Sequence, residues 1–215
     1  MDVTWLGHAC IRLRGKDGVV LMDPCGKGTG YSIGKQSADI VTASRPGPEH
    51  AFVETIAAPY RLLDAPGEYE ISGVLLNGVQ TAPPGKARQD PATSRNVAFV
   101  VEMDDLRVCH LGGLDHTPGQ DLIEEMSDID VLFAPVGGHG ALDAAGAAEV
   151  ISLLQPRLVV PIRYRTDAAA IDLDPLDPFV KQLGLTVSEP QSKLTVSRSN
   201  IPDDTQIAVL DYRGK

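Results

Sequence analysis

Short apolar runs separated by turn residues dominate the first half of the chain. Three such runs lie at residues 3–6, 10–13 and 19–22, and the stretch GKDG at residues 15–18 is typical of a hairpin connection between the last two. Further strands are expected at residues 39–41, 60–63, 70–76, 97–102 and 107–110, and a short helix is expected at residues 50–57. The pattern predicts an antiparallel beginning that continues into more strands.

Helix and strand signals alternate in the second half. The stretch TPGQ at residues 117–120 has the capping-box spacing with proline at the first helical position, which predicts a helix that runs to about Met126. Asp143 is a typical N-cap for the next helix, and Gly184 closes the last one. The other elements expected are a strand at 131–136, a helix from 143 to about 154, a strand at 158–162, a helix from 174 to 184 and a strand at 206–211.

Each half of the chain therefore leads from strands into helices, with no linker between the halves. A sheet that covers one face with helices and the other with a second sheet satisfies this order. We predict one domain over residues 1–215 with an α/β fold, a four-layer αββα sandwich of two mixed sheets with helices outside. The antiparallel beginning favours this arrangement over a doubly wound sheet. The polar, proline-bearing stretch at residues 82–96 is expected to be a long surface loop.

Composition narrows the possible partners and compartment. With 215 residues, 43% of them hydrophobic and 22% charged, the chain can bury a full core. Its net charge of -10 opposes binding to nucleic acid or anionic lipid, so neither is expected as a partner. The oligomeric state is left open.

The three cysteines, Cys10, Cys25 and Cys109, have no paired spacing and predict neither a disulfide framework nor a thiolate zinc site. The chain starts without a basic region followed by an apolar stretch, and no run approaches the roughly 20 apolar residues of a membrane span. A soluble protein of the reducing cytoplasm is expected.

Five histidines carry most of the candidate chemistry: His8, His50, His110, His116 and His139. Each lies just past a predicted strand or at the start of a helix, and such ends often converge on one edge of an α/β fold. Taken alone, the five could equally be surface or capping histidines that fall there by chance.

Several motifs near these histidines occur in the order of one known superfamily. They are TWLGHACIRL near the start, VVLMDP after it, GEYEISGV at residues 67–74, VCHLGGLDH at 108–116, LFAPVGG at 132–138 and VVPIRY at 159–164. In these motifs the chain resembles the metallo-β-lactamase superfamily, and most of all its ascorbate-6-phosphate lactonase-like branch and related Zn-dependent hydrolases. The resemblance spans about residues 3–210. It implies an αββα fold and hydrolysis of esters, lactones, amides or phosphodiesters with one or two zinc ions.

The superfamily holds these ions partly with a loop of pattern His-x-His-x-Asp-His after a strand. On this sequence that loop falls on residues 45–50, RPGPEH. The first histidine position is Arg45 and the second is Gly47, while Glu49 takes the place of the aspartate and His50 matches.

Three further ligand positions lie downstream. The histidine that ends a strand matches His110, the aspartate that bridges both metals falls on Gly113, and the last histidine falls on Arg163. Four of the seven positions therefore have no family ligand, and the remnant metal ligands are Glu49, His50 and His110. Neither metal site is complete with these residues, because zinc hydrolysis needs about three protein ligands and an open position.

The arginines suggest what has replaced the metals. Arg45 and Arg163 are permanent cations with five donors each, and they can neutralise Glu49, Glu68 or Asp115 in a cleft without metal. The leading hypothesis is a metal-free, catalytically weak or inactive relative with no cofactor that binds a small anionic molecule in the old cleft. The residues expected to line this ligand pocket are His8, Arg45, Glu49, His50, Glu68, His110, Asp115, His116 and Arg163.

Purely structural roles for these residues, and two enzyme hypotheses, stay open as alternatives. The arginines could face solvent, Glu68 could be an ordinary strand-edge carboxylate, and His8 and His116 match positions where a supporting hydrogen bond is expected rather than ligation. In the second hypothesis, a slow lactone, ester or phosphoester hydrolase survives with zinc at low occupancy on Glu49, His50 and His110, with His8 or His116 as possible helpers. An acid–base hydrolase using His110 with Glu49 is the third hypothesis.

Overall fold

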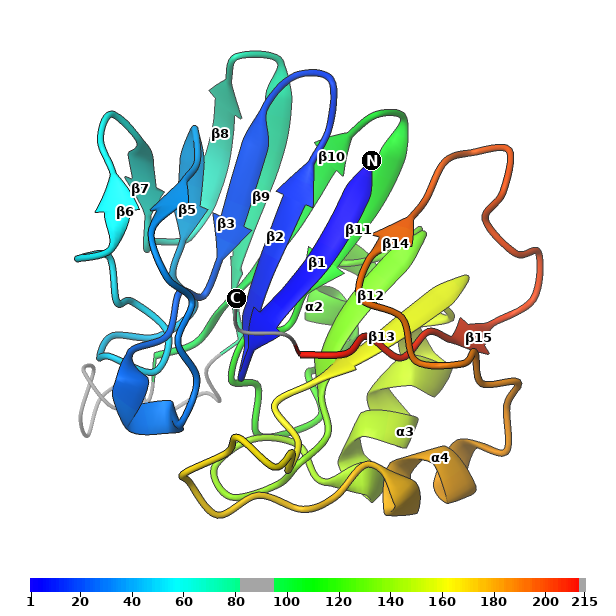
Figure 1. The fold of residues 1–215 in the computed structure, drawn as a ribbon. Helices are drawn as coiled ribbons and strands as arrows, with labels where there is room; N and C mark the ends of the chain where they lie inside the picture. Colours follow the sequence, from blue (N-terminus) through cyan, green and yellow to red (C-terminus); the bar gives the residue numbers. More distant parts are fainter. Residues whose placement is uncertain (82–94, 213–215) are drawn as a thin grey trace.

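In the computed structural model, two mixed β-sheets pack face to face and α-helices lie beside the second sheet (Figure 1). The structure describes residues 1–81 and 95–212, so the loop expected at 82–96 lies outside the described residues except for its last two positions. The α/β sandwich of two mixed sheets is confirmed. Within the described residues, no helix is long and apolar enough to cross a membrane.

The first sheet has the order β14-β1-β2-β3-β5-β7. Its strands are β1 (Asp2–Gly7), β2 (Cys10–Arg14), β3 (Val19–Met22), β5 (Ile40–Thr42), β7 (Arg61–Leu63) and β14 (Leu194–Thr195). The expected hairpin joins β2 to β3, and its Gly15 N–H donates to the Gly18 carbonyl at 3.0 Å. Strands β1 to β3 are antiparallel, whereas β3, β5 and β7 run parallel, so β1, β3, β5 and β7 all end at the same edge.

The second sheet has the order β15-β13-β12-β11-β10-β9-β8. Its strands are β8 (Gly67–Ile71), β9 (Val74–Gln80), β10 (Val97–Met103), β11 (Leu106–His110), β12 (Val131–Pro135), β13 (Leu158–Ile162) and β15 (Gln206–Ile207). Strands β11, β12, β13 and β15 are parallel. The single strand expected at residues 70–76 is wrong: the segment is a β8–β9 hairpin, because Ser72 and Gly73 both adopt positive φ (54° and 86°), as a tight type I′ connection requires.

The helices are α2 (Gln120–Glu125), α3 (Ala144–Leu154) and α4 (Asp177–Leu183), with a 3-10 helix η1 (Lys27–Thr29) in the first half. Asp143 caps α3 as expected and accepts a hydrogen bond from the Gly146 N–H at 2.8 Å. Helix α2 begins later than the capping box predicts. Thr117 does not cap it, because its hydroxyl donates instead to Glu149 on α3 at 2.7 Å.

The helix expected at residues 50–57 is also wrong. One helical turn forms, with the Ala51 N–H donating to the Gly47 carbonyl at 2.8 Å, but the next N–H, of Phe52, donates to the carbonyl of Pro24 at 2.8 Å. That tertiary bond diverts the chain, which then forms the short strand β6 (Ile56–Ala57) beside β4 (Gln36–Ser37).

The main core lies between the sheets and extends under the helices, with Trp5, Phe99 and Phe133 among its largest buried side chains. A second cluster covers the outer face of the first sheet, where Leu21 and Val41 pack with Tyr31. The irregular segment around η1 thus covers this face in the place of a helix. Since both sheets end their parallel strands at one edge, the loops of that edge meet there (Figure 1).

Candidate functional site

The site is built from residues that follow the carboxyl ends of the parallel strands. His8 follows β1, Asp23 follows β3, Arg45 follows β5, His110 ends β11 and Arg163 follows β13. Ligand sites commonly form outside such strand ends. Hydrogen bonds join the sheets here: for example, the Arg163 N–H donates to the His8 carbonyl at 2.9 Å, and His110 donates to the Ala9 carbonyl at 2.8 Å.

Three of these residues hold a strained backbone. His8, Asp23 and Arg163 have φ values of 50°, 47° and 51°, in the left-handed region that residues other than glycine rarely adopt. Each costs on the order of 1 kcal/mol, and such residues gather at functional sites. The strain supports the assignment of this edge as the site.

Asp23 is a buried carboxylate that the sequence analysis did not single out. It accepts hydrogen bonds from the Ser44 N–H at 2.7 Å, from the Ser44 hydroxyl and from Nδ1 of His50 at 2.7 Å. Burial raises its pKa, but the interaction with His50 and the hydrogen bonds from His50 and Ser44 outweigh burial and hold the pKa below its usual range. Asp23 therefore stays ionised and fixes the His50 ring, leaving Nε2 of His50 for another partner.

His110 is not available as a metal ligand. Its Nε2 donates to the carbonyl of Ala9, and its Nδ1 accepts the N–H of Gly112 at 3.1 Å. Burial lowers its pKa, which keeps the ring neutral. The sequence-based assignment of His110 as a remnant ligand is wrong, because both of its ring nitrogens are already used.

His8 is in the opposite situation. Its side chain is fully buried, and neither ring nitrogen has a hydrogen-bond partner among the described residues. Burial, helped by the charges of His50 and Arg163, lowers its pKa to about 3, so the ring is neutral near pH 7. Its Nε2 lies 3.8 Å from Oε2 of Glu49.

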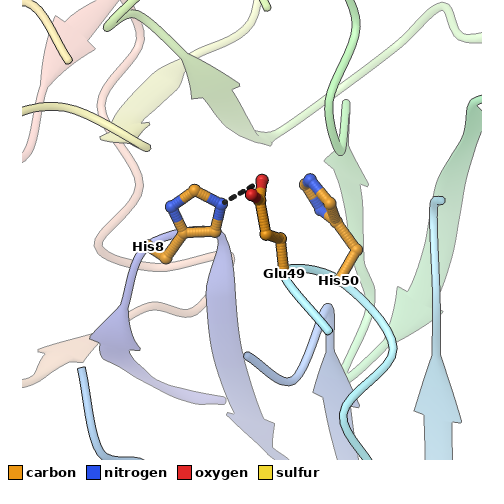
Figure 2. A group of neighbouring side chains, drawn as sticks. All are labelled: His8, Glu49 and His50. Atoms are coloured by element: carbon orange, nitrogen blue, oxygen red, sulfur yellow. Dashed lines mark ion pairs between the residues drawn. The ribbon is translucent and has the colours of Figure 1, made fainter. Parts of the chain in front are cut away.

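Figure 2 shows the carboxylate of Glu49 between the imidazole rings of His8 and His50. One ligand atom from each of the three residues lies within 4.8 Å of the other two. The structure therefore brings the remnant ligands Glu49 and His50 together with His8 rather than with His110.

The two arginines reach the loop at residues 138–140, Arg163 as a buried side chain and Arg45 as a partly buried one. Arg163, 6% exposed, donates to the carbonyls of Gly138 at 2.6 Å and His139 at 2.9 Å. Arg45 donates to the carbonyl of Gly140 at 3.1 Å. Both arginines thus hold the loop at residues 138–140, and in each case the Nε–H has no partner among the described residues.

Arg45 also fills the volume beside Gly113. A Cβ atom at Gly113 would lie 2.7 Å from Nε and 2.9 Å from Cδ of Arg45. No side chain fits at position 113 while Arg45 holds this conformation. Positions 45 and 113, which both lack the family's metal ligand, are therefore sterically complementary: the arginine at 45 needs a glycine at 113.

A pocket of about 290 Å³ opens between these groups. It is lined by Arg45, Pro46, Gly47, Pro48, Glu49, His50 and Arg163. A Cβ at Gly47 would meet nothing within 4 Å, so the position of the family's second histidine is open space. The charged groups on the pocket wall are two guanidinium groups and one carboxylate.

Other residues expected in this pocket lie elsewhere. Glu68 is on the edge strand β8 and lines a different pocket with Asn77 and Arg107, so its predicted place in the cleft is wrong. Asp115 accepts a hydrogen bond from Nδ1 of His116 at 2.8 Å and lies 3.8 Å from Arg45. Asp115 and His116 line a neighbouring pocket of about 370 Å³.

The residues present do not fit a two-metal centre. The positions of three histidines and the bridging aspartate carry Arg45, Gly47, Arg163 and Gly113, none of which is a zinc ligand. His110, at a further ligand position, has no free nitrogen.

Comparison with known proteins agrees with the fold. The family model described as the beta-lactamase superfamily domain matches residues 2–163. A crystal structure of a candidate Zn-dependent hydrolase of the metallo-beta-lactamase superfamily from Thermotoga maritima is 30% identical, covers 97% of both chains and superposes with a TM-score of 0.80.

Curated relatives are similar over most of their length. A UPF0173 metal-dependent hydrolase of Archaeoglobus fulgidus is 27% identical over 218 residues, covering 87% of this chain and 94% of the relative. A UPF0173 protein of Pyrococcus furiosus is 25% identical over 204 residues, covering 85% of this chain and 90% of the relative. The chain belongs to the metallo-β-lactamase superfamily.

Proposed function

We propose that this chain binds a small anionic ligand, carrying a phosphate or carboxylate group, in the pocket between residues 45–50 and Arg163. The proposal includes the loss of two-metal hydrolysis by the route that the superfamily uses. The relatives are named metal-dependent hydrolases, so the proposal describes a change of function on the same fold.

The observation that carries the proposal is the position of Arg45. Its guanidinium stem occupies the volume into which a side chain at position 113 would project. A permanent cation there repels divalent ions and attracts anions. The replacement of the metal ligands is thus coupled to the arrival of a positive group in the same space.

The local charge and hydrogen bonding favour an anion in particular. Arg45 and Arg163 contribute two positive charges to the pocket wall against one negative charge from Glu49, although the whole chain has a net charge of -10. Guanidinium groups bind oxyanions with strong charge-assisted hydrogen bonds, and both arginines line the pocket.

The two enzyme hypotheses from the sequence are less well supported. A metal on Glu49, His50 and His110 requires a free nitrogen on His110, and so does acid–base catalysis by His110 with Glu49. Both ring nitrogens of His110 are held by backbone groups.

Calorimetric titration with inorganic phosphate and with glucose 6-phosphate, in the presence of EDTA, tests the proposal. We expect binding of both ligands at one site, and none of glucose. Arg163→Ala should abolish binding. Glu49→Gln should strengthen it, because this substitution removes the one carboxylate among the described residues that line the pocket.

Arg163 also supports the loop at residues 138–140, so its loss could disturb folding. Arg45→Lys keeps the charge but loses the planar fork, and it should weaken phosphate binding while the thermal midpoint stays within a few degrees. Arg61→Ala, on the edge strand β7, is the matched control and should leave binding unchanged. The proposal fails if phosphate and glucose 6-phosphate produce no heat with the unmodified protein, or if Arg45→Lys binds as tightly as Arg61→Ala.

A further inference from the structure

We propose that His8, Glu49 and His50 form a site for one divalent transition-metal ion, with a ligand set different from that of the two-metal centre. His8 belongs to none of the seven family ligand positions, and His110, which does, is excluded. This inference goes beyond the anion binding proposed above, which does not require a metal.

The distances suit a single ion. Nε2 of His8 and Oε2 of Glu49 are 3.8 Å apart, and the ligand atoms of all three residues lie within 4.8 Å of one another. Zinc binds imidazole nitrogen and carboxylate oxygen at about 2.0–2.2 Å, so two donors on one ion lie about 3–4 Å apart. The Glu49 side chain is 47% exposed, so it has room to rotate toward an ion held by the histidines.

The state of His8 points to a missing partner. A fully buried imidazole with two unpartnered nitrogens is unfavourable, because a buried polar group without a hydrogen bond costs about 1–3 kcal/mol. The ring cannot turn outward easily: its backbone is held at φ 50°, and its carbonyl accepts the N–H of Arg163. An ion between His8 and Glu49 would supply a partner for Nε2, the nitrogen that faces Glu49.

His50 is prepared for the same role. Its Nδ1 is bound to the buried carboxylate of Asp23 at 2.7 Å, and Ser44 holds that carboxylate through two more hydrogen bonds. A histidine fixed by a carboxylate through one nitrogen and directed at a metal through the other is a common arrangement in metal sites. Asp23 and His50 therefore resemble a metal-binding histidine together with the carboxylate that orients it.

The donor set selects the class of ion. Two imidazoles and one carboxylate suit zinc, cobalt or iron(II), whereas magnesium prefers a shell of oxygen ligands. The pocket on the open side would leave a coordination position for water or an anion. Arg163 lies close enough to weaken the site through its charge, so we expect binding weaker than in a site without a neighbouring cation.

Titration of chelator-treated protein with Zn²⁺ and with Co²⁺ tests this inference. We expect one ion per chain, a visible absorption band of bound Co²⁺ that Zn²⁺ displaces, and no binding of Mg²⁺. Glu49→Gln should weaken Zn²⁺ binding by more than about 10-fold, since even loss of a group that only supports a ligand costs that much. This variant alters a half-exposed side chain, so it should fold normally.

His8→Asn should abolish the Co²⁺ band, and asparagine tolerates the left-handed backbone at this position. His116→Ala and His139→Ala, two histidines outside the group, are the matched controls and should bind Zn²⁺ like the unmodified protein. The inference is overturned if no ion binds at one per chain, or if Glu49→Gln binds Zn²⁺ as tightly as the controls.

The two proposals can fail separately. Phosphate binding is measured in EDTA, and Zn²⁺ binding is measured without phosphate. Glu49→Gln should act in opposite directions, strengthening phosphate binding and weakening Zn²⁺ binding. A pocket that binds phosphate but no Zn²⁺ would support the anion site and reject the metal site.

Discussion

The pocket has an arginine wall and a histidine wall, which differ in the hydrogen-bond partners of their side chains. On the arginine wall, Arg45 and Arg163 donate their terminal N–H groups to carbonyls of the loop at residues 138–140. On the histidine wall, His50 lines the pocket and is anchored to Asp23, while the neighbouring His8 is buried outside the lining and has two nitrogens without a partner among the described residues. Each wall keeps buried polar atoms without a partner among the described residues, Nε of both arginines and both nitrogens of His8, but only the arginines bind a backbone loop through their terminal N–H groups.

This difference shows which parts of a metal site can change independently. Hydrogen bonds among Asp23, Ser44 and His50 form a frame that supports the histidine wall. None of these bonds involves the residues at positions 45, 113 and 163. The outer positions can therefore change from metal ligands to arginine or glycine without loss of the frame. The first two predictions test the frame and the arginine wall in turn.

The largest effect is expected from Asp23→Asn. The Asp23 carboxylate accepts three buried hydrogen bonds, and hydrogen bonds to a charged group contribute about 1.5–3 kcal/mol each, whereas in the variant the Ser44 N–H would face a neutral amide. Asparagine tolerates the left-handed backbone of Asp23, so the change isolates the charge. Urea unfolding at pH 7 measures the loss; a loss below about 1 kcal/mol would show that the frame does not depend on this carboxylate.

A smaller effect is expected at the contact between Gly113 and Arg45. Gly113→Ala should destabilise the fold by about 1–3 kcal/mol, because the new Cβ would lie 2.7 Å from Nε of Arg45. In the Arg45→Ala background the same change should cost little. Urea unfolding of the four proteins of this double-mutant cycle gives the coupling, and additive effects would show that Arg45 does not occupy this volume.

Much of the fold follows from local sequence. Strands β1 to β3 and β10 to β13 were predicted within one or two residues, because alternating or continuous apolar runs bounded by turn residues determine them. The helix expected at residues 50–57 failed for a non-local reason: the Phe52 N–H binds the carbonyl of Pro24. No local pattern reports such a bond, and it overrides helix propensity.

Site residues were predictable from the sequence only where a family motif gave their position. Arg45, Glu49, His50 and Arg163 line one pocket as expected. The exclusion of His110 was not predictable, because its partner Ala9 lies 101 residues away in the sequence.

Asp23 was missed because an aspartate between a strand and a proline looks like an ordinary turn residue. Two signals were available: its position directly after a buried strand, and its place in the motif VVLMDP at residues 19–24.

The histidine wall should make stability depend on pH. As the pH falls below about 6.5, His8 of the unfolded chain takes up a proton, whereas in the folded chain its pKa is about 3 and the ring stays neutral. The unfolded state then binds more protons, so the free energy of unfolding decreases as the pH falls from 6.5 toward 3. The lowered pKa of buried His110 acts in the same direction.

Each such histidine contributes at most about 1.4 kcal/mol per pH unit. Urea unfolding in EDTA at pH 7, 6 and 5 measures the slope. His8→Asn should reduce it, while His139→Ala should not, since His139 is an exposed side chain. Equal slopes for these two variants would mean that His8 protonates freely in the folded protein.

The smallest effect on stability is expected from a substitution at Glu68. If ligand binding also stays unchanged, Glu68 lies outside the pocket. Glu68 and Glu49 are both exposed carboxylates that the sequence places in one cleft, but the structure puts Glu68 on the edge strand β8 beside Asn77. Glu68→Gln should change the free energy of unfolding by less than about 0.5 kcal/mol, as surface substitutions usually do. It should leave both phosphate and Zn²⁺ titrations unchanged, whereas Glu49→Gln shifts them in opposite directions. If Glu68→Gln altered either titration as Glu49→Gln does, β8 would have to lie against the pocket, and the two walls described here would no longer enclose the whole site.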